Sequence, residues 1–311
     1  LNFTTGTLDS RITFTRSTTG SYYNSAGVLT QAAVNLLTYS EQFDNAAWTK
    51  GTGSSITANQ TTAPDGTNTA DLFTTNGTAG ANLYYDAITV TANTQYTFSV
   101  YVKLGTMLAA NYKLAFYNVT GSAFITLDVL PSQTVTSSSW TRVTYTVTTP
   151  VGCTSLRVYT YRNSATISSC DVYFWGAQLE TGSVATTYIP TTSSISGAPR
   201  FDYNPSTLQA NGLLIEESRT NLLTYSEQVN QWGSSVNCTV SVDAGIAPDS
   251  NNTADKLAET TANGSHFLSS GFITYSYTSG LAYTRSCFIK QSGRKLVSVY
   301  LPATNFNSLG R

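Results

Sequence analysis

The sequence is poor in charged residues. Only 11% of its 311 residues are Asp, Glu, Lys or Arg, against about a quarter in an average soluble domain. The formal net charge of −1 offers no basic surface of the kind that nucleic-acid-binding proteins need. No run of about 18 consecutive apolar residues occurs, so no membrane-spanning helix is predicted. The sequence therefore argues against nucleic acid as a partner and against membrane insertion.

Histidine and paired cysteines are scarce as well. His266 is the sole histidine, so a Ser-His-Asp triad could occur at most once. We interpret it as a surface or strand residue. The four cysteines, Cys153, Cys170, Cys238 and Cys287, form no CxxC pair, which argues against a zinc site and predicts free thiols. We expect no catalytic residue, and hence no enzyme.

Tyr, Thr, Ser, Asn and Gly take the place of the missing charges. β-branched and aromatic residues favour strands, and small polar residues favour turns. Five segments alternate apolar and polar residues with the period of two that a half-buried strand requires. They are residues 95–103, 112–117, 124–129, 142–147 and 156–161. This pattern predicts an all-β fold, with residues 35–190 forming one antiparallel β-sandwich.

A domain-sized segment occurs twice. The sequence NLLTYSEQ stands at residues 35–42 and again at 221–228, and Trp48 corresponds to Trp232. The match continues to residues 96–103, which align with residues 283–290. A repeat of this size predicts tandem units of the same fold, as in structural arrays. The second copy lacks a counterpart of residues 123–190, so we expect a longer polypeptide, or another subunit, to cover its strand edges.

The chain therefore divides into four predicted parts. Residues 1–34 form an N-terminal arm with a short strand at 11–15, and the arm is expected to dock onto another protein. Residues 35–190 form the first unit. Residues 191–220 form a connector that contains RFDY and LLIEE, and residues 221–311 form the truncated second unit.

Three segments together resemble structural proteins of tailed bacteriophages. They are PRFDYNPSTLQANGLLIEESRTNLLTYSEQ at 199–228, APDGTNTADLF at 63–73 and FWGAQLETGSVATTYIPT at 174–191. The similar proteins are tail fibres and head spike fibres that carry lectin-like or carbohydrate-binding modules. The resemblance implies jelly-roll units, a place on the tail or capsid surface of the virion, and other virion proteins as partners of the arm. It implies no universal catalytic residue.

We also expect a homo-oligomer, specifically a trimer. A surface so poor in charge is badly suited to a solitary soluble monomer. Fibres also gain avidity from carrying several copies of a binding module.

One strand face of the first unit is the candidate site. If the alternation holds, six polar or aromatic side chains point away from the core: Tyr101, Lys103, Tyr117, Arg157, Tyr159 and Tyr161. Aromatic rings stack on the apolar faces of sugars, while Arg and Lys bind hydroxyl or carboxylate groups, so the face could hold a host glycan. The same residue types form protein interfaces, so a subunit contact stays open.

Calcium is the one cofactor that the resemblance leaves open, because jelly-roll modules often hold it on oxygen ligands. Asp171 and Glu180 are the candidate ligands. Taken together, the sequence predicts a non-enzymatic virion fibre protein that attaches to the host surface. One alternative is a decoration or assembly protein that binds only virion subunits. Another is a glycan-degrading tailspike, which would need two carboxylates held in one cleft.

Overall fold

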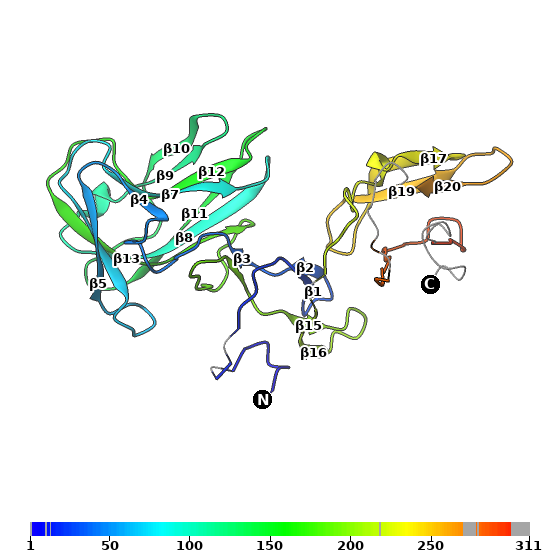
Figure 1. The fold of residues 1–311 in the computed structure, drawn as a ribbon, viewed down its shortest axis with the longest axis horizontal. Helices are drawn as coiled ribbons and strands as arrows, with labels where there is room; N and C mark the ends of the chain where they lie inside the picture. Colours follow the sequence, from blue (N-terminus) through cyan, green and yellow to red (C-terminus); the bar gives the residue numbers. More distant parts are fainter. Residues whose placement is uncertain are drawn as a thin grey trace. The chain divides into compact units, whose positions relative to one another are not determined.

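The computed structural model describes residues 2–9, 11–12, 14–217, 219–269, 278 and 280–299. Thr13 of the predicted arm strand lies outside these residues, as do residues 270–277, 279 and 300–311 of the predicted second unit. Two compact units are formed, and Figure 1 shows the strands of each. The first comprises Leu1–Tyr22, Gln31–Tyr203 and Ala210–Leu214, and the second comprises Tyr23–Thr30, Asn204–Gln209 and Ile215–Arg311. None of the helices among the described residues could span a membrane.

The first unit is built around two five-stranded antiparallel sheets. One sheet has the order β10 (Ala123–Val129), β9 (Leu114–Asn118), β12 (Ser155–Arg162), β7 (Asn82–Thr89) and β4 (Trp48–Lys50). The other has the order β11 (Thr141–Thr148), β8 (Gln95–Leu104), β13 (Cys170–Thr181), β6 (Ala70–Thr75) and β5 (Ser54–Thr61). We call them the β12 sheet and the β13 sheet. The predicted all-β sandwich is confirmed.

Short elements complete the first unit. β3 (Val34–Asn35) pairs with β14 (Ser196–Gly197), β15 (Phe201–Tyr203) pairs with β16 (Ala210–Leu213), and η1 (Ala109–Asn111) is a 3-10 turn. The strand predicted at 11–15 is wrong for its described residues. The Ile12 N–H bonds to the Asp9 carbonyl at 2.9 Å and Arg11 binds the Asp9 carboxylate, so the chain turns there.

The core lies between the two sheets. Its largest fully buried side chains are Trp48, Tyr112, Tyr161, Phe43, Phe73, Phe98, Phe116, Phe174, Leu37, Leu83, Leu114 and Leu156. Burial of each large apolar side chain contributes roughly 1.5–3 kcal/mol relative to exposure. The rings also meet across the layers: Phe73 lies 4.9 Å from Tyr161 between ring centroids, and Phe98 lies 6.1 Å from Phe116. The inward faces of both sheets thus form one continuous core.

A buried carboxylate fastens the start of the sandwich. Asp71 on β6 is 1% exposed and accepts the backbone N–H groups of Phe43 at 2.8 Å and Asn59 at 2.9 Å. Burial raises the pKa of Asp71 to about 6, and the backbone donors oppose this shift without cancelling it. The segment before β4 and the strand β5 are therefore both fixed to β6 by one side chain.

The second unit repeats this arrangement. Asp255 accepts the N–H groups of Val229 at 2.9 Å and Asp243 at 3.1 Å. The indole N–H of Trp232 bonds to the Tyr225 carbonyl at 3.1 Å, just as the indole N–H of Trp48 bonds to the Tyr39 carbonyl at 2.9 Å in the first unit. The equivalent strands pair. They are β17 (Ser234–Val236) with β20 (Phe267–Ser269) and β18 (Cys238–Gly245) with β19 (Ala254–Glu259), while η2 (Val229–Gln231) is a 3-10 turn. The β17–β20 register is shifted by two residues from that of β4 and β7.

The described part of the second unit repeats the opening strands but not the closed core. Leu257 corresponds to the fully buried Phe73 and is 46% exposed, and Ile289 corresponds to the fully buried Val102 and is 58% exposed. Two of the positions that form the core in the first unit are therefore open in the second, as far as its residues are described.

The pKa of Asp71 predicts a pH dependence of stability. Because the folded state holds this proton more tightly than the unfolded chain, the free energy of unfolding should fall as pH rises from about 4 to above 6. A pKa raised from 3.8 to about 6 corresponds to roughly 3 kcal/mol. Chemical denaturation of wild type and Asp71→Asn between pH 4 and 7 measures this contribution.

The Asp71→Asn variant should lose most of the fall that the wild type shows over this pH window, and the remainder should come from Glu41, whose pKa is also raised by burial. The control is Asp65→Asn, which removes an exposed carboxylate in the β5–β6 turn and should keep the part of the fall that Asp71 causes. Identical pH profiles for wild type and Asp71→Asn would contradict the prediction.

Candidate functional site

The outer face of the β13 sheet is covered by the chain segment that follows β13. The Gln178 side chain accepts the N–H of Ile189 at 2.7 Å, and the Glu180 carboxylate accepts the N–H of Thr186 at 2.9 Å. Arg142 on β11 donates to the Thr186 carbonyl at 2.6 Å. Outward-facing side chains of the sheet therefore bind residues 186–189 across it, which leaves little of its centre open.

Tyr101 and Lys103 lie on β8, in this covered sheet. The ring of Tyr101 packs 5.4 Å from Trp175 and 6.4 Å from Tyr188 between centroids. The prediction that these two residues share one face with Arg157 is wrong, because β8 and β12 belong to opposite sheets.

Tyr161 is a second correction. It lies on β12 but is fully buried in the core against Phe73. The pairing of β12 with β7 shifts register between Tyr159 and Tyr161, so the simple alternation fails at this point. Tyr161 therefore points inward, whereas Arg157 and Tyr159 remain on the outer side.

The outer face of the β12 sheet gathers the remaining candidates. Tyr117, Arg157 and Tyr159 are joined there by neighbours that the sequence alone did not indicate. We call the whole set the aromatic–arginine face: Tyr84 and Asp86 on β7, Tyr117 on β9, Phe124 and Asp128 on β10, and Arg157, Tyr159 and Arg162 on β12. These residues come from four adjacent strands of one sheet.

Arg157 lies at the centre of this face. Its guanidinium is 2.6 Å from the Asp86 carboxylate and donates to the Tyr159 hydroxyl at 3.1 Å. Its central carbon lies 4.3 Å from the Tyr84 ring centroid and 5.4 Å from that of Tyr117. Cation–π attraction of this kind contributes roughly 0.5–2 kcal/mol. The guanidinium is thus fixed by charge, hydrogen bonding and ring contacts together.

Asp86 reaches Arg157 because β7 bulges. The pairing of β7 with β12 shifts register between Leu156 and Val158, and Ala87 adopts a left-handed φ of 55°. One Asp86 oxygen accepts the Ala87 N–H at 2.8 Å, which leaves the other for the guanidinium. Burial tends to raise the pKa of Asp86, but the bond and charge of Arg157 and the Ala87 N–H lower it below its usual value.

A second arginine repeats the pattern at the side of the face. The central carbon of Arg162 lies 4.9 Å from the Phe124 ring centroid, and its guanidinium is 4.0 Å from the Asp128 carboxylate. Ser164 joins these two residues, because its N–H bonds to Asp128 at 3.2 Å and its hydroxyl accepts from Arg162 at 2.9 Å.

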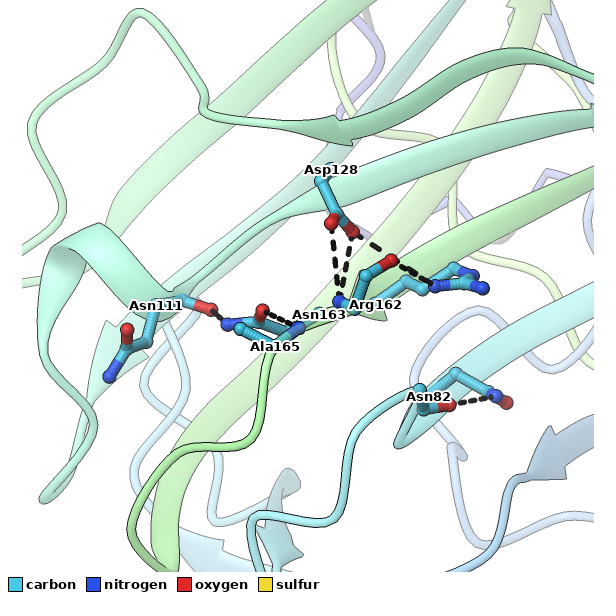
Figure 2. A network of polar contacts seen from close by, with 8 residues as sticks. Asn82, Asn111, Asp128, Arg162, Asn163 and Ala165 are labelled. Atoms are coloured by element: carbon cyan, nitrogen blue, oxygen red, sulfur yellow. Dashed lines mark hydrogen bonds and ion pairs between the residues drawn. The ribbon is translucent and has the colours of Figure 1, made fainter.

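Asn163, which follows Arg162 in the sequence, anchors the turn after β12. Asn163 donates to the Asn111 carbonyl at 3.1 Å and accepts the Ala165 N–H at 3.0 Å (Figure 2). The end of β12 that carries Arg162 is therefore held on both sides by hydrogen bonds.

The aromatic rings form a continuous set across the strands. Tyr84 lies 5.1 Å from Tyr159, Tyr117 lies 4.9 Å from Phe124, and Phe124 lies 5.9 Å from Tyr159 between centroids. Phe124 is 36% exposed, whereas Tyr159 is 5% exposed beneath its neighbours. A ligand could therefore contact Tyr84, Tyr117 and Phe124, while Tyr159 supports Arg157 from below.

The two predicted calcium ligands do not meet. Asp171 and Glu180 stand nine residues apart on the single strand β13, which separates them by about 30 Å. Asp171 accepts the Thr106 N–H at 2.7 Å, and Glu180 is bound to Thr186. Within the described residues, no three acidic, histidine or cysteine side chains gather as a metal site would require.

Histidine and cysteine contribute nothing to this face. His266 belongs to the second unit and contacts the Asn237 carbonyl at 2.8 Å. All four cysteines are free, as the sequence predicts, and only Cys287 is exposed.

The Asp86–Arg157 contact predicts a titration change. In Arg157→Met, the hydrogen bond and the positive charge disappear while the burial of Asp86 remains, so the pKa of Asp86 should rise. Carboxylate ¹³C NMR over pH 2–7 measures it. Arg142→Met, on the β13 sheet, should leave the Asp86 titration unchanged. An unaltered Asp86 titration in Arg157→Met would contradict the geometry.

Comparison with known proteins finds a similarity over most of the first unit. Residues 35–176 match the family model described as "Carbohydrate binding domain". No curated protein sequence matches the chain.

Three solved structures are similar in chain path over about half of this chain. The CBM22-1 xylan-binding domain of Xyn10C from Paenibacillus barcinonensis is 20% identical, with a TM-score of 0.39, covering 50% of this chain and 98% of that one. The CBM22-1–GH10 modules of xylanase 10B from Clostridium thermocellum, complexed with xylohexaose, are 17% identical, with a TM-score of 0.38, covering 48% and 29%. The enzymatically active domain of tailspike protein 4 from bacteriophage CBA120 is 15% identical, with a TM-score of 0.36, covering 48% and 21%. Over residues 35–176 the chain is therefore similar to carbohydrate binding domains.

Proposed function

We propose that the first unit binds a glycan on its aromatic–arginine face, and that the chain is a bacteriophage fibre protein that uses this unit to attach to the host surface. The observation that carries the glycan proposal is Arg157, held rigidly among three tyrosine rings on the outer side of a sheet. The match of residues 35–176 to a carbohydrate binding domain supports it.

The chemistry of the face suits a sugar. Sugar rings have apolar C–H faces, which stack on aromatic planes, and hydroxyl groups, which need donors and acceptors. Tyr84, Tyr117 and Phe124 offer rings, while Arg157 offers N–H donors and Asp86 offers an acceptor. Because these side chains already hold one another in place, binding would cost little side-chain entropy.

The opposite sheet is the weaker candidate for the same role. Residues 186–189 are bonded across its outer face, and Trp175 is 4% exposed beneath Tyr188. A ligand there would have to displace chain that is hydrogen-bonded to buried side chains.

The virion role is supported by the sequence resemblance to tail and head fibre proteins and by the tandem repeat. We propose partners accordingly. Other virion proteins bind the chain through residues 1–34, and the chain assembles as a trimer. No hydrolytic step is proposed for the face, because its two carboxylates, Asp86 and Asp128, are each placed beside an arginine.

The test uses the full chain with Tyr117→Ala and Phe124→Ala. A glycan array carrying bacterial surface polysaccharides identifies the ligand for the wild type, and calorimetry measures its affinity. Each variant should weaken binding by about 1–3 kcal/mol, roughly fivefold to 150-fold, as for aromatic anchors at interfaces. Tyr173→Ala is the matched control, because Tyr173 lies half-buried on the opposite sheet.

The control should bind as the wild type does. Absence of any glycan ligand for the wild type would overturn the proposal, as would equal affinity of all three variants. If the same variants instead reduced incorporation of the chain into phage particles, the face would be a subunit interface.

A further inference from the structure

The face carries two arginines, and each is matched by a carboxylate. Arg157 pairs with Asp86 at 2.6 Å, and Arg162 stands 4.0 Å from Asp128. Arginine is the residue type best suited to bind carboxylate, sulfate or phosphate groups of a ligand. Here the guanidinium that would do so already faces an acidic side chain, so the positive charge is balanced before any ligand arrives.

From this balance we propose that Asp86 is a specificity-determining residue. By occupying Arg157, it excludes glycans that carry carboxylate or sulfate groups and leaves the face selective for uncharged sugars. The inference rests on the proposed glycan-binding function and concerns the same face. Asp86 acts through Arg157, so it is a positioning residue for the guanidinium as well as a source of negative charge.

The backbone at Asp86 explains how this residue both positions the Arg157 guanidinium and balances its charge. At the β7 bulge, one carboxylate oxygen caps the Ala87 N–H and the other receives the guanidinium N–H. An asparagine at this position could keep the first bond through its carbonyl oxygen. Its amide would then present N–H groups to Arg157, so the guanidinium would lose its acceptor and its counter-charge.

The guanidinium also has unused capacity to bind an anion. The Arg157 side chain is 23% exposed, so part of it is within reach of a ligand, and the three tyrosine rings hold the charge on the outer side of the sheet. Freed from Asp86, Arg157 would present a fixed, planar set of donors to an acidic sugar. Asp128 would still balance Arg162, so the change would be confined to one charge.

The experiment compares polygalacturonate with its fully methyl-esterified form. The two polymers share one sugar backbone, and the ester replaces each charged carboxylate with an uncharged methyl ester. The full chain, as wild type and as Asp86→Asn, is run in affinity gels that contain either polymer at low and high salt. Asp65→Asn is the matched control, because it also removes one negative charge, from the β5–β6 turn at the β13 sheet.

We expect the wild type and Asp65→Asn to show no retardation by polygalacturonate. Asp86→Asn should be retarded by it at low salt, with an affinity at least about threefold to fivefold above the detection limit that the wild type does not reach, the scale of one partly exposed charge pair. High salt should abolish the gain. Asp86→Glu should restore the exclusion, and the double variant Asp86→Asn/Arg157→Met should lose the gain.

Three results would overturn the proposal. They are binding of polygalacturonate by the wild type, no gain in Asp86→Asn, and a gain that persists without Arg157. If Asp86→Asn fails to fold, as judged by its thermal melt, Asp86→Ser makes the same test, because its hydroxyl is a short acceptor for neighbouring backbone N–H groups and carries no charge. The affinity gels with polygalacturonate test the role of Asp86 and need no known neutral ligand. The glycan array tests whether the face binds a glycan at all. Failure of the Asp86 proposal can therefore be told apart from failure of the proposed function.

Discussion

The pairing of β12 with a strand on each side is the constraint on which the site depends. β12 lies between β7 and β9, so its outward residues stand beside outward residues of both neighbours. Antiparallel registration places Tyr117 opposite Arg157 and Tyr84 opposite Tyr159. Because cross-strand neighbours lie within about 5 Å, these pairs must interact once the strands have formed. The electrostatics of the face follow from this registration.

The sequence predicts the fold better than it predicts the face. Period-two alternation indicates the five strands. Four of them have one side in the core, whereas β10 buries none of its residues and leaves Leu127 44% exposed. Alternation cannot indicate bulges, which depend on the partner strand. Tyr161 is assigned to the wrong side for this reason, because the shift on β12 lies between Tyr159 and Tyr161. The sequence of a single strand also does not show which of the two sheets the strand belongs to. Tyr101 and Arg157 therefore look alike in sequence, although they face opposite ways in the sandwich.

β7 shows why the remaining face residues are missed. Its sequence NLYYDAIT has no regular alternation, because the bulge at Asp86 and Ala87 interrupts it. The one available signal is the pair of adjacent tyrosines followed by an acidic residue. Of this pair, Tyr85 packs against Trp48 at 5.2 Å and Tyr84 packs against Tyr159. The irregularity that hides the strand is also what brings the carboxylate to the arginine.

The aspartate that fastens the start of each unit, Asp71 in the first and Asp255 in the second, shows how such repeats can diverge. Both accept main-chain N–H groups, which every residue except proline can supply. The donor positions are accordingly Phe43 in one unit and Val229 in the other. The second donor is Asn59 or Asp243, each in the left-handed region that these two residue types tolerate. One aspartate therefore preserves the architecture of a unit while the residues around it are free to change, so copies can acquire different surfaces on a common frame.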